Sequence, residues 1–215
     1  MEVINKKYQM NRIYLLPLVV ILFFSLNSCH PLTRLIYGVR QPKLVKASTV
    51  SKYMKKLDMD NEIILTPRDI NSYLKILKIV DGIPNLLVFN QQGIALKDTG
   101  TNSCNAPLFD QTQNVCSLQI LLNRSVGKLD EFLAMLKPLT QEDSLRFEEA
   151  RRKDINFTAF VSSARYAGYL NKDHVKPWVD NLSAINECKL NTYIINMDLL
   201  DGVWTEEMIN KIKYK

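Results

Sequence analysis

The chain has 215 residues, of which 47% are hydrophobic and 23% are charged, and its 28 basic and 22 acidic residues give a formal net charge of +6. The hydrophobic fraction argues against wholesale disorder, and seven glycines with eight prolines exclude a collagen-like or low-complexity chain. The length suits one domain of ordinary size with an appended segment, and four cysteines are too few for a disulfide scaffold.

The N-terminal segment is predicted to be an export signal rather than part of the fold. Lys6, Lys7 and Arg12 precede an apolar run over residues 13–26. This run is too short for a standard membrane-spanning helix, which needs about 20 residues, and a basic flank before a short apolar stretch is typical of a signal peptide. An uncleaved anchor is the alternative. Residues 1–28 are therefore left out of the predicted fold.

The apolar run ends in Leu26-Asn27-Ser28-Cys29, which resembles the lipobox of bacterial lipoproteins. The resemblance implies that Cys29 carries a fatty acid such as palmitate and becomes the mature N-terminus, so that the chain is held on a membrane through its N-terminal lipid. The rest of the chain would then lie outside the cytoplasm, in the cell envelope or periplasm. His30 after the cysteine resembles lipoproteins sorted to an outer membrane, where the bacterium has one.

The mature part is only mildly basic. Residues 1–28 hold three of the basic and one of the acidic residues, which leaves a net charge of +4. Because the chain contains no compact basic cluster, we expect no nucleic-acid partner. Lys52, Lys55 and Lys56 are interpreted as the solvated face of a short helix.

Residues 29–60 are predicted to form a tether and a first helix, and residues 61–215 the folded domain. Apolar residues at spacings of three and four predict helices, and short continuous apolar runs predict buried strands. In chain order, the predicted elements are a helix over 49–57, a strand over 62–65, a helix that begins with Thr66 as N-cap and Pro67 as first residue, strands over 85–89 and 94–96, a helix near 128–137, a charged helix within 138–154, a strand over 157–161, a helix from 171 to about 185 kinked at Pro177, a strand over 190–197 and a helix over 204–214.

Two stretches resemble thioredoxin-fold proteins. The first is Gly82-Ile83-Pro84-Asn85 with the hairpin that follows it, because thioredoxins carry a Gly-(Ile/Val)-Pro-Thr segment in which a cis proline opens a strand. Residues 128–133 resemble the helix after that hairpin. The second stretch, 157–198, resembles the strand, active-site loop, helix and strand of the same fold, and Asn196-Met197-Asp198 resembles the Asn-(Val/Ile)-Asp that ends the last of these strands.

The chain departs from that family at the residues that react. Tyr166-Ala167-Gly168-Tyr169-Leu170 stands where the family has Trp-Cys-Gly-Pro-Cys, so that Ala167 and Leu170 replace the two cysteines that thiol–disulfide exchange requires. The two stretches also occur in reversed order. The resemblance therefore implies an α/β fold with a thioredoxin-like mixed sheet flanked by helices, either permuted or with residues 62–78 as the first strand and helix.

Three cysteines besides Cys29 remain. Cys104 and Cys116 flank eleven residues of a polar segment, and our first interpretation is a structural disulfide between them. It would stabilise the fold by roughly 3 kcal/mol in the chain-entropy model. A displaced redox pair and two free thiols remain the alternatives. Cys188 is expected to be a small packed residue.

Other chemistry has little support. His30 and His174 are the two histidines and show no metal-ligand spacing, so we expect neither a metal nor another cofactor. Ser162-Ser163 lacks the Gly-x-Ser-x-Gly pattern of hydrolases. The acidic pairs are interpreted as a solvated helix face and a strand end.

The segment around Pro84 is the candidate binding site. In the family that the chain resembles, the backbone beside this proline faces the redox loop and pairs with an extended peptide, so Ile83 and Pro84 would face Tyr166 and Tyr169. Two tyrosines beside a strand edge suit peptide binding by strand addition, whereas a plain strand-opening proline beside two half-buried tyrosines is the alternative.

The sequence thus predicts a non-enzymatic role: a membrane-tethered lipoprotein whose redox-inactive thioredoxin-like domain is a binding or structural module, with an envelope protein or peptide as partner. The alternative function is an envelope thiol–disulfide oxidoreductase that uses Cys104 and Cys116.

Overall fold

The computed structural model describes residues 36–80, 82–96, 112–117, 128–151, 154–205 and 209. The chain divides into two units, Met1–Val39 and Arg40–Lys215, and all helices and strands named below belong to the second. The expected signal peptide, Cys29, Cys104 and most of the helix predicted over 204–214 lie outside the described residues. Within the described part, no helix has the length and apolar character needed to span a membrane.

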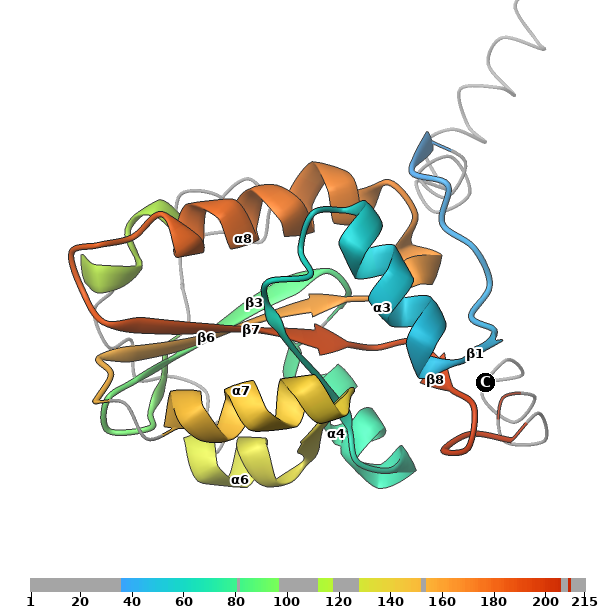
Figure 1. Ribbon diagram of the computed structural model, residues 1–215, viewed down its shortest axis with the longest axis horizontal. Coiled ribbons are helices and arrows are strands. Elements are labelled where there is room, and N and C mark those ends of the chain that lie inside the picture. Colours follow the sequence, from blue (N-terminus) through green and yellow to red (C-terminus); the bar gives the residue numbers. More distant parts are fainter. Residues whose placement is uncertain are drawn as a thin grey trace, which may run out of the picture. The chain divides into compact units, whose positions relative to one another are not determined.

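The second unit is built on a mixed six-stranded sheet with the order β4-β3-β6-β7-β2-β5 (Figure 1). β7 pairs in parallel with both β6 and β2, and the remaining pairs are antiparallel. A separate parallel pair joins β1 (Leu44–Val45) to β8 (Leu199–Leu200). The strands of the large sheet are β2 (Ile63–Pro67), β3 (Asn85–Asn90), β4 (Ala95–Leu96), β5 (Leu136–Pro138), β6 (Phe157–Ser163) and β7 (Leu190–Asn196).

Helices cover both faces of this sheet, with α3 and α8 on one face and α4, α6 and α7 on the other (Figure 1). The predicted fold class, an α/β fold with a mixed sheet flanked by helices, is therefore confirmed. The helices are α3 (Ala47–Lys56), α4 (Ile70–Val80), α6 (Leu129–Ala134), α7 (Gln141–Arg151) and α8 (Lys176–Ser183).

The central strands are apolar on both faces. Successive side chains of a strand point to opposite sides, so Tyr193 and Ile195 of β7 pack in the cluster with α4, α6 and α7, while Ile194 packs in the cluster with α3 and α8. Phe160 and Val161 of β6 divide in the same way. Strands buried on both faces give continuous apolar runs, which is why these two could be predicted.

The hairpin stretch around β3 and the stretch that begins with β6 lie side by side in the sheet. β3, from the hairpin stretch, pairs with β6 along its whole length, from Asn85 opposite Ser162 to Asn90 opposite Phe157. The hairpin turn also follows the prediction, because Gly93 has a φ of 72°. A Cβ at that position would approach the Cβ of Leu129 to 3.2 Å, so glycine also allows α6 to pack closely.

The start of α4 differs from the prediction. Thr66 and Pro67 continue β2, and α4 begins at Ile70. Oδ1 of Asp69 accepts a hydrogen bond from the Ser72 N–H at 2.8 Å and so caps the helix. The reason is β5, which we did not predict: it pairs with the end of β2 and keeps it extended up to Pro67.

Two further boundaries differ. A π-helical turn (η3, Asn171–Val175) precedes α8, so that Pro177 lies in the first turn of α8 instead of kinking one long helix. Proline is tolerated there because first-turn N–H groups have no helical partner. In addition, Val50 and Met54 of α3 are fully buried in one cluster with Ile64, so the folded part begins before residue 61.

Candidate functional site

The parallel strands β2, β6 and β7 end at one edge of the sheet, which is where open α/β sheets commonly bind ligands. The Ile83–Pro84 peptide bond is cis, and the following Asn85 is opposite Ser162 near the end of β6. The loop after β6 forms a short 3-10 turn, η2 (Arg165–Ala167). We call the side chains gathered here the carboxyl-edge site: Tyr53, Tyr73, Arg165, Tyr166, Asn171 and Asp198.

A buried carboxylate holds the loop after β6. Asp198 follows β7 and is 4% exposed, and its Oδ1 and Oδ2 accept hydrogen bonds from the Arg165 N–H at 3.0 and 3.1 Å. Burial raises the pKa of Asp198 to about 6, although these hydrogen bonds and the charge of Arg165 act in the opposite direction. Asp198 is therefore the group at this edge that titrates in the mildly acidic range.

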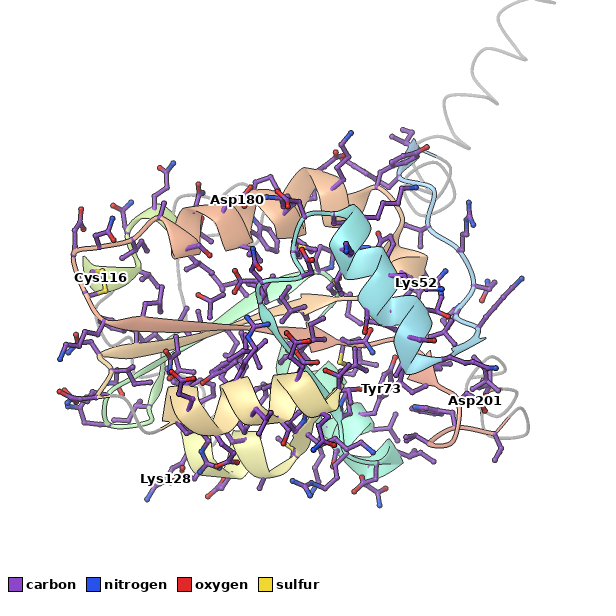
Figure 2. The ribbon with its side chains drawn as sticks, viewed as in Figure 1. Lys52, Tyr73, Cys116, Lys128, Asp180 and Asp201 are labelled. Atoms are coloured by element: carbon purple, nitrogen blue, oxygen red, sulfur yellow. A yellow bond between two sulfur atoms is a disulfide. The ribbon has the colours of Figure 1, made fainter. Side chains whose placement is uncertain are left out.

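Two tyrosines meet beneath the loop. The hydroxyl oxygens of Tyr73 and Tyr166 are 3.5 Å apart, and the ring of Tyr73 packs edge-on against Trp204 with a centroid distance of 4.8 Å (Tyr73 is labelled in Figure 2). Burial, reinforced by Tyr73 and by the charge of Asp198, raises the pKa of Tyr166 far above its ordinary value. Both hydroxyls therefore stay protonated at physiological pH, when neither can act as a base.

Asn171 links the loop to α3. Its Nδ2 donates to the Tyr53 hydroxyl at 3.0 Å and to the Ala164 carbonyl at 2.8 Å, while its Oδ1 accepts from Ser163 Oγ at 2.9 Å. The guanidinium of Arg165 lies 5.8 Å from the centre of the Tyr53 ring, within the range of a cation–π contact. The polar groups of the loop are thus largely paired within the domain.

One buried side-chain amide at this edge has no acceptor for the hydrogens of its nitrogen. Asn196, the last residue of β7, is fully buried, and its Oδ1 accepts from the Asp198 N–H at 3.3 Å. Its Nδ2 has no hydrogen-bond partner within the described part of the chain. Buried polar groups are rarely left unpaired, so among the described residues Nδ2 of Asn196 is an open donor position near Asp198.

The chain's own N-terminal segment also contacts the loop. The Arg40 N–H donates to the Tyr166 carbonyl at 2.7 Å. Four residues further on, β1 pairs with β8, which begins directly after Asp198, and the Asp201 N–H donates to the Val45 carbonyl at 2.9 Å. The segment that leads from the predicted lipid anchor therefore occupies backbone positions at the carboxyl edge.

The four residues predicted to bind a peptide are brought to this edge, but they are not equally accessible. Pro84 is buried and Ile83 is half-buried against the core. Tyr166 is directed at Tyr73, and only Tyr169 is well exposed, at 62%. A partner at this edge would therefore contact Tyr169 rather than the pair of tyrosines that the sequence suggested.

The disulfide expected from the sequence has the wrong pairing. Cys116, in the short 3-10 turn η1 (Val115–Ser117), is bonded to Cys188, and Cys104 lies outside the described residues. Cys188, expected to be a small packed residue, does pack against the core, but it is also bonded to Cys116. Both cysteines pack against the cluster under α8, and spacing could not reveal a bond between residues 72 positions apart.

The disulfide and the carboxyl-edge site lie at opposite ends of the sheet. Cys188 precedes the first residue of β7 by two positions, whereas Asp198 follows the last residue of β7 by two. A strand of this length spans roughly 20 Å. Figure 2 shows Cys116 and Tyr73 toward different ends of the domain. The disulfide is therefore not placed to act together with Pro84.

The sequence contained a partial signal for the residues that we missed. Asn196-Met197-Asp198 is recognisable as a strand-end motif, but Asp198 binds main-chain groups of Arg165 and Tyr166, which are more than 30 positions away in the sequence. Nothing in the local pattern of α4 marks Tyr73 as different from an ordinary core residue.

The six residues of the carboxyl-edge site hold the loop after β6 in place, and none of them is an activated nucleophile. The hydroxyl groups of the site form hydrogen bonds or keep their protons because burial raises their pKa. Its carboxylate accepts hydrogen bonds from main-chain N–H groups. Within the described part of the chain, no group of three or more His, Cys, Asp or Glu side chains could hold a metal ion.

Comparison of the chain with protein-family models, with curated proteins and with solved structures finds no match.

Proposed function

We propose that the chain is a bacterial lipoprotein, anchored through Cys29, whose thioredoxin-like domain binds a partner in the cell envelope without exchanging disulfides. The observation that carries the proposal is the loop after β6. It follows the end of β6, where Ser162 pairs with Asn85 directly after cis-Pro84, yet it contains Ala167 and Leu170 where a redox loop would carry sulfur, and Asp198 holds it in place through hydrogen bonds.

The Cys116–Cys188 bond supports an extracytoplasmic location. Disulfides persist in oxidising compartments and are rare in the reducing cytoplasm. This agrees with the basic flank, the short apolar run and the lipobox-like Leu26-Asn27-Ser28-Cys29 at the N-terminus.

The alternative, an envelope oxidoreductase using Cys104 and Cys116, is less well supported. It requires Cys116 to be released from Cys188, and it requires chemistry at the end of the sheet that lacks Pro84. Thiol–disulfide exchange also needs a reachable sulfur, and neither of the two cysteines that the structure describes, Cys116 and Cys188, belongs to the carboxyl-edge site.

We further propose that the partner is an envelope protein or peptide that contacts Tyr169. An exposed aromatic side chain supplies apolar area and a hydroxyl at small entropic cost, which is why tyrosine is enriched in interfaces. The loop that carries Tyr169 is held rigidly by Asp198 and Asn171, and a rigid binding surface lowers the cost of association.

The test is affinity purification of the intact protein from membranes, with mass analysis of its N-terminus and of bound proteins. We expect an N-terminal acylated Cys29, a bound protein retained by the wild type and by Leu145→Ala, and loss of that protein on Tyr169→Ala. Leu145 is the matched control because it is also an exposed apolar side chain, at 70%, on α7.

Two results would contradict the proposal. Recovery of the unmodified full-length chain from the cytosol would remove the lipid anchor. Reduction of insulin by the purified protein, lost on Cys104→Ser, would establish the oxidoreductase in its place.

A further inference from the structure

Positive charge is concentrated at the start of the mature chain. Residues 29–57 contain seven basic residues and no acidic one, whereas residues 58–215 contain 18 basic and 21 acidic residues. The net charge of +4 on the mature part is therefore the sum of +7 on residues 29–57 and −3 on residues 58–215. Such asymmetry points to a charged surface as the partner of one end of the molecule.

Three of these cations form one face of α3. The three exposed lysines have the three- and four-residue spacing of one helix face: Lys52, Lys55 and Lys56. Val50 and Met54, on the other side of the helix, are buried. Lys52 is labelled on α3 in Figure 2. We call these three residues the α3 lysine face.

The α3 lysine face is not neutralised by the described part of the domain. The ion pairs of the described residues involve Lys176 and Lys189 instead. Asp58 is the acidic residue nearest to α3 in the chain, and its Oδ2 lies 3.9 Å from Nζ of Lys176. Further exposed cations precede the helix in the chain: Arg40, Lys43 and Lys46. A solvated helix face usually mixes both signs of charge, and this one does not.

The predicted anchor keeps this charge close to a bilayer. Ten residues separate Cys29 from Arg40, where the second unit begins. Even a fully extended chain of this length reaches at most about 40 Å. A basic surface held so near a membrane meets its headgroups at high effective concentration, and one lipid plus a polybasic surface is a common two-part membrane attachment.

We propose that the α3 lysine face lies against the anionic headgroups of the membrane that anchors the chain. The inference rests on the lipid anchor of the proposed function and adds an orientation to it. Because Tyr53 on the same helix contacts Arg165 and Asn171, this orientation also fixes the carboxyl-edge site relative to the bilayer.

The first experiment measures lysine acylation in the full-length protein, reconstituted into vesicles of phosphatidylcholine or into vesicles that contain about one third phosphatidylglycerol. We expect Lys52, Lys55 and Lys56 to react at least about threefold more slowly on the anionic vesicles, with the difference lost at roughly 0.5 M salt because salt screens exposed charges. Lys75 and Lys78, which are exposed on α4, should react equally on both.

The second experiment compares two triple variants by flotation with the same vesicles. Lys52→Gln, Lys55→Gln and Lys56→Gln together should weaken the preference for anionic over neutral vesicles about a hundredfold, because each lysine near an anionic surface contributes roughly a factor of five. The matched control carries Lys75→Gln, Lys78→Gln and Lys128→Gln, which remove the same charge at other exposed positions and should keep the preference.

The outcomes separate this inference from the proposed function. Failure to float with neutral vesicles would overturn the lipid anchor of the proposed function, whereas flotation with anionic vesicles that depends on the α3 lysine face would still show that this face binds anionic headgroups. Equal acylation and equal flotation on both vesicle types would overturn it. Protection of the three lysines by an acidic envelope protein, but not by anionic vesicles, would also overturn it and assign the face to a protein partner.

Discussion

The two ends of the central sheet are closed by different means. At the amino ends of β6 and β7, the Cys116–Cys188 bond ties a segment from outside the sheet to the turn before β7. At the carboxyl ends, Asp198 and Asn171 hold the loop with hydrogen bonds. The first end is fixed by a covalent bond whose strength does not depend on pH, and the second depends in part on Asp198, whose charge can change.

The difference separates a part of the domain that is fixed by a covalent bond from a part that is fixed by hydrogen bonds. The carboxyl end contains the cis Ile83–Pro84 bond and the loop after β6, which Asp198 binds through hydrogen bonds. The sulfur atoms that the structure does join lie where they stabilise the domain. Each prediction below tests one end against the other, beginning with the largest expected effect.

Removal of the disulfide should give the largest loss of stability. Cys188→Ser opens a loop that spans 72 positions, and the chain-entropy model predicts a decrease of about 4 kcal/mol in the free energy of unfolding. Urea unfolding of wild type and variant measures the change, and reductant should lower the stability of the wild type but not of the variant.

Cys104→Ala is the matched control for the pairing. It should leave the Cys116–Cys188 link in place, as peptide mapping under non-reducing conditions would reveal. A Cys104–Cys116 cross-link in the wild type would contradict the structure at this end.

The carboxyl end should respond to pH where the disulfide end does not. Burial raises the pKa of Asp198 to about 6 in the folded protein, above an ordinary value of about 3.9. The folded state therefore binds this proton more tightly than the unfolded state, and its stabilising effect is complete below about pH 4 and is lost as the pH rises through about 6. Two pKa units correspond to roughly 3 kcal/mol.

Asp198→Asn isolates this contribution, because the variant cannot titrate there. The difference in unfolding free energy between wild type and variant should fall by up to roughly 3 kcal/mol between about pH 4 and pH 7, measured by urea unfolding at each pH. A difference that stays constant over this range would mean that Asp198 is not desolvated as the structure indicates.

Asp198→Ala should loosen the loop and destabilise the fold moderately. It leaves the partly buried Arg165 N–H without its acceptor, for which a loss of about 1 to 2 kcal/mol is expected. Amide hydrogen exchange should accelerate at residues 165–168 and stay unchanged near Cys188. Asp201→Ala, at an exposed position three residues later, is the control and should change stability by less than about 0.5 kcal/mol.

The fold could be predicted largely because its central strands are unambiguous. The run at 85–89 and the strands at 157–161 and 190–197 are apolar on both faces, so their identity does not depend on tertiary contacts. The elements that were missed, such as β5 and the β1–β8 pair, are two or three residues long and exist only because a partner strand lies beside them.

The site could be predicted only in part, because its residues come together through tertiary contacts. The sequence places Pro84 before β3 and Tyr166 after β6, and these two strands pair in the structure. It did not reveal that Tyr166 turns inward to Tyr73, since these residues are 93 positions apart. The pairing of Cys116 depended in the same way on a contact between distant segments.

The smallest expected effect is at the tyrosine pair. Tyr166→Phe removes one hydroxyl whose only described partner is Tyr73 at 3.5 Å, a long distance for a hydrogen bond between hydroxyls. The ring would keep its packing, so the free energy of unfolding should change by less than about 1 kcal/mol. Tyr73→Phe is the reciprocal control, and a double-mutant cycle should give a coupling of no more than about 1 kcal/mol. A larger coupling would indicate that the hydroxyl pair, together with Asp198, holds this end of the sheet more tightly than its geometry suggests.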